Sequence, residues 1–342
     1  MTRRRIAVVL GGRSSEHEIS LASARSVIDA LAGAGHDVVT VAIDRSGRWQ
    51  LGRGESPALA SGGSPAPGGR PARLPGKEVT STLADVDVVF PVLHGPFGED
   101  GTVQGLLELA GVPYVGAGVL GSALCMDKDV FKAVLRDHGI PVTPNITLRT
   151  GEEPRNPYGY PCFVKPACLG SSVGITKAHS EEELRDGVAL AFRHDEKVLV
   201  EQYVAGIEVE VGVLGNRRPV ASLPGEIVVT QNEWYDFTAK YEQGEMDLVV
   251  PARIAPDQIE RAQELAVAAF VATECEGMAR ADLFVRDDGE VLVNELNTIP
   301  GFTATSVYAR LFAASGIDYP ALLEQLADLA LERHERRSQL LY

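Results

Sequence analysis

The sequence predicts a multi-domain α/β protein, because strand and helix patterns alternate along its first third and because it exceeds the length of one ordinary domain. The chain has 342 residues, whereas single domains usually hold about 100 to 200 residues. Apolar runs over Ile6–Leu10, Val38–Ile43 and Val86–Leu93 have the length of strands. A helical pattern over Leu21–Leu31 separates the first two runs. Such alternation is typical of a parallel sheet covered by helices, and we expect one within residues 1–117.

One stretch of this first domain has a different composition. Gly, Pro and Ser dominate residues 52–77, and hydrophobic periodicity is lost there. Both features are typical of a loop, so we interpret the stretch as a flexible insertion and assign it no function.

The charge balance argues against nucleic-acid and membrane-surface partners. Lys and Arg number 32 against 47 Asp and Glu, for a formal net charge of -15. Such a chain has no overall positive field that would attract nucleic acid or anionic lipid. With 45% hydrophobic and 23% charged residues, the composition is that of a globular protein. We expect a small-molecule substrate, no nucleic acid and no membrane.

Location is predicted from the N-terminus and the cysteines. The apolar run that follows the basic start covers only Ile6–Leu10, which is too short for an export signal. No segment approaches the roughly 18 apolar residues of a membrane span. The spacing of the four cysteines is not that of a metal site: Cys125, Cys162, Cys168 and Cys275. We expect a cytoplasmic protein with buried free thiols.

A second domain, α+β in character, is expected over residues 118–203. Apolar residues recur at helical spacing over Asp127–Leu135. Two strand-like runs, Cys162–Pro166 and Val198–Tyr203, flank a polar helical pattern. That helix is predicted over Ser180–Phe192, with its first residue as N-cap and a Glu three residues later.

The remaining residues, 204–342, are predicted to form a third domain. Four runs are expected as strands: Val209–Leu214, Pro219–Val229, Arg280–Arg286 and Glu290–Leu296. The last two are joined by Asp287–Gly289, a hairpin signal. Helices are expected over Pro256–Thr273 and over Pro320–Arg336, whose leucines share one face. We interpret the second of these as a docked terminal helix.

The predicted hairpin carries a candidate metal site. Asp282 lies on its first strand, and Glu295 and Asn297 lie two residues apart on the second, so that they share a face. Mg²⁺ prefers such oxygen ligands, and Arg280 could meet an anion beside it. The alternative is a set of hairpin charges that face water. The Gly/Pro loop Thr298–Thr303 favours the metal site, because such a loop presents backbone N–H groups to anions.

A second candidate is a phosphate-binding loop. Lys165-Pro-Ala-Cys-Leu-Gly-Ser-Ser-Val-Gly174 follows a predicted strand. Its N–H groups and hydroxyls could hold phosphates while Lys165 neutralises their charge. It does not match the Walker pattern, and taken alone it could be an ordinary turn.

Six motifs in one order now make the prediction specific. They are Gly11-Gly-Arg-Ser-Ser-Glu-His-Glu-Ile-Ser20, Leu93-His-Gly-Pro-Phe-Gly-Glu-Asp-Gly101, Met126-Asp-Lys128, the Lys165–Gly174 loop, Tyr235-Asp-Phe-Thr-Ala-Lys-Tyr241 and Asn294-Glu-Leu-Asn-Thr-Ile-Pro-Gly-Phe-Thr303. In these motifs the chain resembles the D-alanine–D-alanine ligases of the ATP-grasp superfamily, over nearly its whole length. The resemblance implies a three-domain ATP-grasp architecture with a Rossmann-like N-terminal domain, a homodimer, and ATP and D-alanine as substrates.

The resemblance also implies positions for ATP and metal. ATP would contact Lys128, Lys165, Glu201, Val204, Glu208 and Lys240. The lysines would meet phosphates, the two glutamates adenine and ribose, and the backbone near Val204 the adenine edge. Two Mg²⁺ ions, which Mn²⁺ can replace, would be held by Asp282, Glu295 and Asn297.

Two amino-acid subsites follow from the same resemblance. Glu16 would bind the ammonium of the first D-alanine near His94, and Ser171 and Tyr241 would join Glu16 in a triad that closes a loop. The carboxylate of the second D-alanine would be received by Ser306 and the backbone of Val307. Arg280 and the N–H of Gly301 would form an oxyanion hole.

Three alternatives remain open at the level of sequence. A sibling ligase could use D-lactate or D-serine as its second substrate, although the Lys240-Tyr241 pair favours an amine over a hydroxy acid. Another ATP-grasp enzyme could act on an unrelated carboxylate. Gly11-Gly12 after an apolar strand could belong to a nucleotide-binding regulatory module, but the full G-x-G-x-x-G pattern is missing. Product analysis separates these classes.

Overall fold

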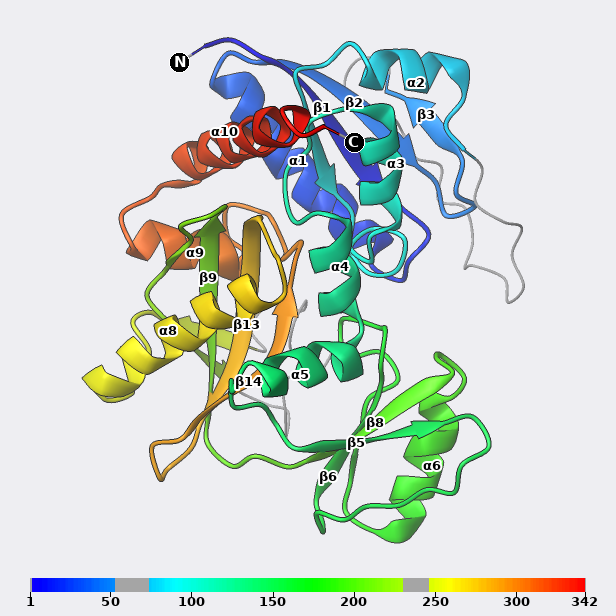
Figure 1. The fold of residues 1–342 in the computed structure, drawn as a ribbon, viewed down its shortest axis with the longest axis vertical. Coiled ribbons are helices and arrows are strands. Elements are labelled where there is room, and N and C mark those ends of the chain that lie inside the picture. Colours follow the sequence, from blue (N-terminus) through cyan, green and yellow to red (C-terminus); the bar gives the residue numbers. More distant parts are fainter. Residues whose placement is uncertain (1, 53–73, 230–245, 342) are drawn as a thin grey trace.

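The computed structural model describes residues 2–52, 74–229 and 246–341, and their strands form three sheets. The first sheet lies at one end of the molecule and the middle, green segment at the other, with the third sheet between them (Figure 1). The described part therefore consists of three units, each with its own sheet and helices, in agreement with the predicted α/β class.

The first sheet is parallel at its centre, as the sequence predicts. Its strands and the helices with them are β1 (Arg5–Gly11), α1 (His17–Gly33), β2 (Asp37–Ile43), β3 (Trp49–Leu51), α2 (Lys77–Leu83), β4 (Val88–Val92) and α3 (Thr102–Ala110). Helix α4 (Val119–Met126) follows, within the range predicted for the second domain, and packs against α3 and the third sheet. The strand order is β3-β2-β1-β4, in which β1 runs parallel to β2 and β4. Only β3 is antiparallel among these described strands. Strand β1 is apolar and buried on both faces, which is typical of a central parallel strand.

The C-terminal helix packs on this first sheet. Helix α10 (Tyr319–Ser338) buries Leu322, Leu323 and Leu326 in one apolar cluster with residues of β1 and α1. Figure 1 shows α10, in red, beside α1. The predicted docked terminal helix is confirmed, and it ties the end of the chain to the first domain.

The middle segment is a small α+β unit. Helix α5 (Lys128–Asp137) precedes β5 (Asn145–Arg149), β6 (Cys162–Pro166), β7 (Thr176–Ala178), α6 (Glu181–Ala191) and β8 (Lys197–Gln202). These strands form an antiparallel sheet in the order β5-β8-β6-β7. The predicted cap is confirmed, because the Ser180 side chain accepts a hydrogen bond from the Glu183 N–H at the start of α6.

The third sheet has the order β12-β11-β9-β13-β14, and β10 pairs with β9. Its elements are β9 (Ile207–Gly215), β10 (Val220–Ala221), β11 (Gly225–Val229), β12 (Met246–Val249), α8 (Pro256–Ala272), β13 (Gly277–Val285), β14 (Val291–Asn297) and α9 (Val307–Ala314). The single strand predicted over Pro219–Val229 is wrong in one respect. The chain leaves the sheet at Ser222–Pro224, because a proline has no N–H for the ladder.

The predicted hairpin sets the register of the candidate metal site. Strands β13 and β14 pair antiparallel with Asp282 opposite Glu295, and the register shifts directly after Asp282. Gly289 adopts φ +89° in the connecting turn, a conformation that glycine reaches without steric strain. The carboxylates of Asp282 and Glu295 therefore start from facing positions on neighbouring strands.

The cysteines agree with the prediction in all but one position. All four are free, and Cys125, Cys162 and Cys275 are buried. Cys168 is partly exposed because it lies in the loop after β6 rather than inside a sheet. Within the described ranges, no helix is long and apolar enough to cross a membrane.

Candidate functional site

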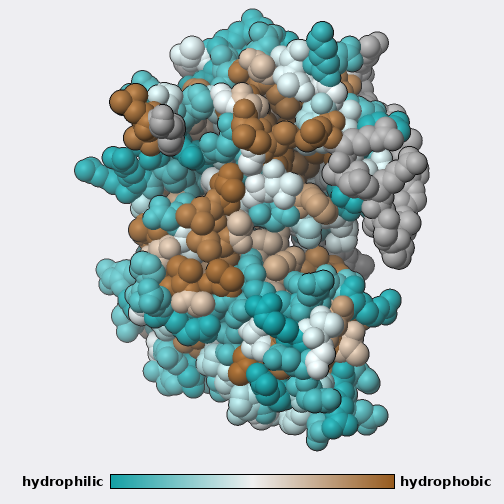
Figure 2. All heavy atoms as spheres, turned by 45° about the vertical axis from the view of Figure 1, so that its right-hand side comes forward, coloured by the Kyte–Doolittle hydropathy of each residue, from teal (hydrophilic) through white to brown (hydrophobic). Residues whose placement is uncertain are grey.

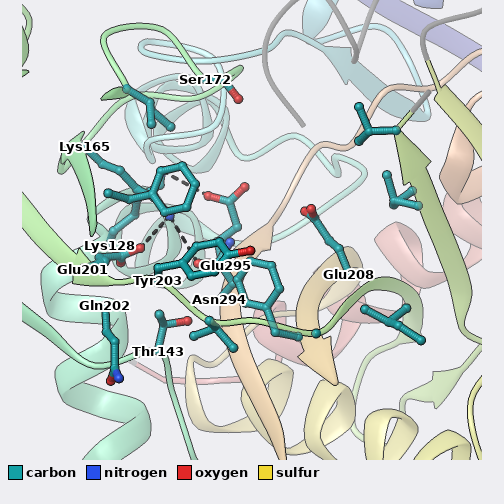
Figure 3. Close-up of a pocket in the computed structure, with 18 of the residues that line it drawn as sticks. Lys128, Thr143, Lys165, Ser172, Glu201, Gln202, Tyr203, Glu208, Asn294 and Glu295 are labelled. Carbon is teal, nitrogen blue, oxygen red and sulfur yellow. Dashed lines mark hydrogen bonds and ion pairs between the residues drawn. The ribbon is translucent and has the colours of Figure 1, made fainter. Parts of the chain in front are cut away.

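A pocket of about 410 Å³ opens between the middle and third sheets. One part of its wall is apolar and includes Phe163 from β6, Tyr203 and Val204 from the connection after β8, and Ile207 and Phe284 from the third sheet. Figure 3 shows this pocket with Tyr203 and Glu208 on different sides of it. A planar aromatic ring such as adenine can be buried between such side chains.

Two lysines lie at the polar end of this pocket. Lys128 is the first residue of α5, whose N-cap Asp127 accepts hydrogen bonds from the first-turn N–H groups. The Lys128 Nζ donates to the Leu169 carbonyl at 2.8 Å and lies 3.3 Å from Glu295 Oε2. Lys165, near the end of β6, has its Nζ 2.5 Å from Glu201 Oε2 (Figure 3). Two ammonium groups from different elements thus face the same cavity.

Of the hairpin acids, Glu295 lies beside Lys128, whereas Asp282 is held by an arginine and an amide. The guanidinium of Arg280 donates to both oxygens of Asp282 at 2.7 Å. It also lies 3.0 Å from Glu210 Oε2. The Asn297 amide donates to Asp282 at 3.1 Å. The structure therefore brings together the acids and the arginine that the sequence placed on one face.

These donors fit a hard cation by their chemistry. Asp282, Glu295 and Asn297 offer carboxylate and amide oxygens, the ligands that Mg²⁺ prefers. In this structure Arg280 and Lys128 supply the positive charge beside the two carboxylates. Over the described ranges, no cluster of three or more His, Cys, Asp or Glu side chains could hold a metal by itself, so the amide and further oxygens from a ligand would have to complete the shell.

Glu16 lies in a second site, which is formed by loops. It directly precedes α1 and is only 5% exposed. The Ser171 hydroxyl, from the loop after β6, donates a hydrogen bond to Glu16 Oε1. Gly170 and Gly95 pass so close that a side chain at either would contact the Glu16 carboxylate. Three separate loops therefore meet at one buried acid.

The loop after β6 holds an unusual backbone. Ser171 and Ser172 have φ of +51° and +56°, a left-handed region that residues other than glycine enter at a free-energy penalty of about 1 to 3 kcal/mol. Ser171 both contacts Glu16 and lines the nucleotide-sized pocket. The strained turn thus joins the two sites.

His94 contributes a buried ring beside Glu16. Its Nδ1 lies 2.9 Å from the Ile299 carbonyl, which makes Nδ1 the donor in a neutral ring. Burial lowers the pKa of His94, although the charge of Glu16 opposes this. Within the described part of the chain, Nε2 is buried without a hydrogen-bond partner, so it is able to bond to a ligand.

Glu99 also belongs to this site, and the sequence did not single it out. Its two oxygens accept hydrogen bonds from the Gly95 N–H at 2.8 Å and the Ile299 N–H at 3.3 Å. Burial and, to a lesser degree, the charge of Glu16 raise the pKa of Glu99 to about 8. Only its place in the Leu93–Gly101 motif could have indicated it.

Glu99→Gln is expected to change how stability depends on pH. A raised carboxyl pKa means that the folded state favours the protonated form. The wild-type protein should therefore lose stability relative to Glu99→Gln as pH rises from about 4.5 towards 8, by roughly 2 to 4 kcal/mol. Urea unfolding at pH 5 and pH 8 measures this. If the difference in unfolding free energy between the two proteins were the same at both pH values, the prediction would be contradicted. The backbone hydrogen bond that is lost in Glu99→Gln contributes equally at both pH values and therefore cancels.

The loop after β14 and the start of α9 form a third group. Ser306 Oγ accepts a hydrogen bond from the Thr303 N–H at 3.0 Å. Gly301 lies beside it, since a Cβ added there would be 3.4 Å from Ser306 Oγ. Val307 begins α9, where first-turn N–H groups lack helical partners and attract anions.

The remaining predicted residues divide into two sets. Glu201, Val204 and Glu208 all line the nucleotide-sized pocket. Lys240 and Tyr241 lie outside the described residues. The structure thus gathers the predicted nucleotide residues, apart from Lys240, around one pocket.

The pocket, with hard oxygen donors at its polar end and a buried acid just beyond, places the chain among the ATP-grasp ligases, which use ATP to join a carboxylate to an amine. Two family models, described as D-ala D-ala ligase N-terminus and D-ala D-ala ligase C-terminus, match residues 5–117 and 134–328. The chain belongs to the D-alanine–D-alanine ligase family, and its activity is the ATP-dependent, ADP-forming ligation of D-alanine that serves cell-wall synthesis.

Individual relatives agree with this membership. The D-alanine–D-alanine ligase of Thermoanaerobacter sp. (strain X514) is 44% identical, with 98% of this chain and 99% of the relative covered. A D-alanine–D-alanine ligase structure from Coxiella burnetii is 36% identical with a TM-score of 0.82, covering 99% of this chain and 97% of that chain. The VanG D-Ala:D-Ser ligase of Enterococcus faecalis is 35% identical with a TM-score of 0.80, covering 96% and 100%. A Bacillus anthracis ligase complexed with ATP is 26% identical with a TM-score of 0.78, covering 98% and 99%.

Proposed function

We propose that this chain makes D-alanyl-D-alanine through a D-alanyl phosphate intermediate, in the cytoplasm, as a peptidoglycan precursor. One observation carries the mechanism: Ser171 hydrogen-bonds to Glu16 and also lines the nucleotide-sized pocket. An amino acid whose ammonium meets Glu16 would therefore have its carboxylate near the phosphates of a bound nucleotide.

ATP would occupy the pocket between the two sheets. Its adenine would lie among the apolar side chains near Val204, with Glu201 and Glu208 towards the adenine and ribose. Lys128, Lys165 and, from outside the described residues, Lys240 would meet the phosphates. The Bacillus anthracis relative is complexed with ATP, which supports ATP as the nucleotide.

Two Mg²⁺ ions, which Mn²⁺ can replace, would be held by Asp282, Glu295 and Asn297 together with phosphate oxygens. When bound, the ions would offset phosphate charge and orient the γ-phosphate. Arg280 and Lys128 already lie beside the carboxylates of Asp282 and Glu295, so positive charge at this position supports the proposal.

The first half-reaction activates a carboxylate. A carboxylate oxygen of the first D-alanine attacks the γ-phosphorus, the new O–P bond forms, and the bond to the ADP oxygen breaks. Glu16 holds the ammonium, and His94 lies beside that subsite. Tyr241 would join Glu16 and Ser171 to close the site and exclude water, which would otherwise hydrolyse the acyl phosphate.

The second half-reaction forms the peptide bond. The second D-alanine, its carboxylate held by Ser306 and the Val307 N–H, attacks the acyl carbon with its deprotonated amine. Arg280 and the Gly301 N–H would stabilise the tetrahedral oxyanion. Collapse breaks the bond between the acyl carbon and the phosphate oxygen, the departing phosphate takes the proton from the attacking nitrogen, and the dipeptide remains.

We also propose the domain division 1–117, 118–203 and 204–342, and a homodimer. One sheet in each of the three ranges supports the division. Figure 2 shows apolar side chains gathered on the upper part of one face. Exposed apolar residues on α3 and α4 include Leu109, Val119 and Leu120, which supports an interface between copies.

The second substrate is the sharpest test of the proposed function. The likeness to a D-Ala:D-Ser ligase keeps D-serine as the main alternative. With ATP, Mg²⁺ and D-alanine, mass spectrometry should find D-alanyl-D-alanine as the product at neutral pH, and equimolar D-serine or D-lactate should divert only a minor fraction. If the mixed product with D-serine or D-lactate exceeded D-alanyl-D-alanine, the second subsite would be assigned to that competitor instead of D-alanine.

A further inference from the structure

A fully buried lysine stands behind the nucleotide pocket. Lys132 follows Lys128 by one turn of α5, on the same helix face, and its side chain is 0% exposed. Among the described residues Lys128 and Lys165 line the pocket, whereas Lys132 does not. The Lys132 Nζ donates a hydrogen bond to Glu201 Oε1. Lys132 therefore does not line the pocket itself, and its direct contact on the pocket side is this carboxylate.

Glu201 is shared between two lysines. Its Oε2 lies 2.5 Å from the Lys165 Nζ, and the side chain is 1% exposed. Burial alone would raise the pKa of Glu201, but Lys132 and Lys165 outweigh it and lower the pKa to about 2. The trio thus holds one negative charge between two positive charges, so that these three side chains together carry one excess positive charge.

We propose that Lys132 is a positioning residue for nucleotide binding, because it offsets Glu201 and so leaves the ammonium of Lys165 available to the phosphates of ATP. This inference rests on the proposed function, in which Lys165 contacts those phosphates. Without Lys132, Glu201 would hold Lys165 in a neutral, buried pair, where Coulomb attraction is strong because the effective dielectric constant is low. The phosphates would then compete with a carboxylate for the same ammonium.

The test compares ligands that differ in phosphate content. Calorimetry would measure the binding of adenosine, ADP and ATP, with Mg²⁺ present, to the wild type and to Lys132→Met, which keeps the side-chain length without the charge. The expected result is about tenfold weaker binding of ATP, a change equivalent to about 1.4 kcal/mol, and less than about twofold for adenosine. Equal loss for adenosine and ATP would mean that Lys132 only packs the pocket wall, and would overturn the proposal.

A double variant keeps the test decisive even if Lys132→Met folds poorly. In Lys132→Met with Glu201→Gln, no unbalanced carboxylate remains beside Lys165. The ratio of ATP affinity to adenosine affinity should then return to that of Glu201→Gln alone, which completes a double-mutant cycle. If the ratio stays as low as in Lys132→Met, or falls further, the role of Lys132 is not to offset Glu201.

Lys165→Met separates this inference from the proposed function. The proposed function predicts at least about tenfold weaker ATP binding in Lys165→Met, since a direct phosphate contact is lost. If Lys165→Met binds ATP normally, the phosphate assignment itself is wrong. If Lys165→Met is impaired while Lys132→Met keeps the wild-type ratio of ATP to adenosine affinity, only the inference about Lys132 fails.

Discussion

Replacing Arg280 with methionine is expected to lower kcat for dipeptide formation by about 10²- to 10³-fold, the usual effect of removing one donor from an oxyanion hole. Arg280 is held in place by Asp282 and Glu210, so its guanidinium is oriented before substrate arrives. Because the oxyanion develops only when the amine attacks, the KM for ATP should change by less than about threefold. Steady-state kinetics of dipeptide release measures both quantities.

The hairpin offers a matched control. Arg286 directly follows the same strand, its side chain is 43% exposed, and it pairs with Asp288 and Glu290 in the turn. Arg286→Met should keep kcat within about twofold of the wild type, because surface ion pairs contribute little. Thermal unfolding of both variants would check that they fold. If folded Arg280→Met had a normal kcat, the assignment of Arg280 to the oxyanion hole would be wrong.

Asp282→Asn is expected to lower the rate of ADP release by about 10³-fold, an effect of roughly 4 kcal/mol on the barrier. The substitution keeps the shape of a 2% exposed side chain but removes the charge that a divalent ion requires. The half-saturating Mg²⁺ concentration should rise at least about tenfold. A magnesium titration of ADP release measures this, and an unchanged Mg²⁺ requirement would contradict the metal assignment.

Asp288 is the control for this second prediction. It lies on the same hairpin, in the turn, with its side chain 57% exposed and paired with Arg286. Asp288→Asn should leave both the rate and the Mg²⁺ requirement unchanged. The two variants carry the same chemical change, so a difference between them reports position rather than charge alone.

The sequence predicted the fold well where patterns are local. The apolar runs of β1, β2, β6 and β8 have strand length, and the Ser180 cap and the Asp287–Gly289 turn are short-range signals that the structure reproduces. Several elements were not predicted: helices α2, α3, α4 and α9 and strands β3, β5, β7 and β12. All of them are brief, with three to nine residues, and in such elements local propensity is weak and tertiary packing decides the conformation.

The residues of the candidate site could be predicted only in part, through the motifs that the chain shares with a known family. Motif residues such as Glu16 and Ser171 lie 155 positions apart, and only the resemblance could bring them together before the structure did. Lys132 and Glu99 were not predicted as site residues, for a different reason. Their importance lies in burial and in the charges that surround them, and neither property is visible in a linear sequence.

The most direct test of the central claim, that ATP activates the first D-alanine as an acyl phosphate, is an isotope-transfer measurement. Purified protein would turn over D-alanine labelled with ¹⁸O in both carboxylate oxygens, in the presence of ATP and Mg²⁺. Mass spectrometry should find one ¹⁸O in the released phosphate for each dipeptide formed, because the oxygen that attacks the γ-phosphorus leaves with it. Dipeptide formed with unlabelled phosphate would rule out the acyl phosphate, and with it the mechanism proposed for this site.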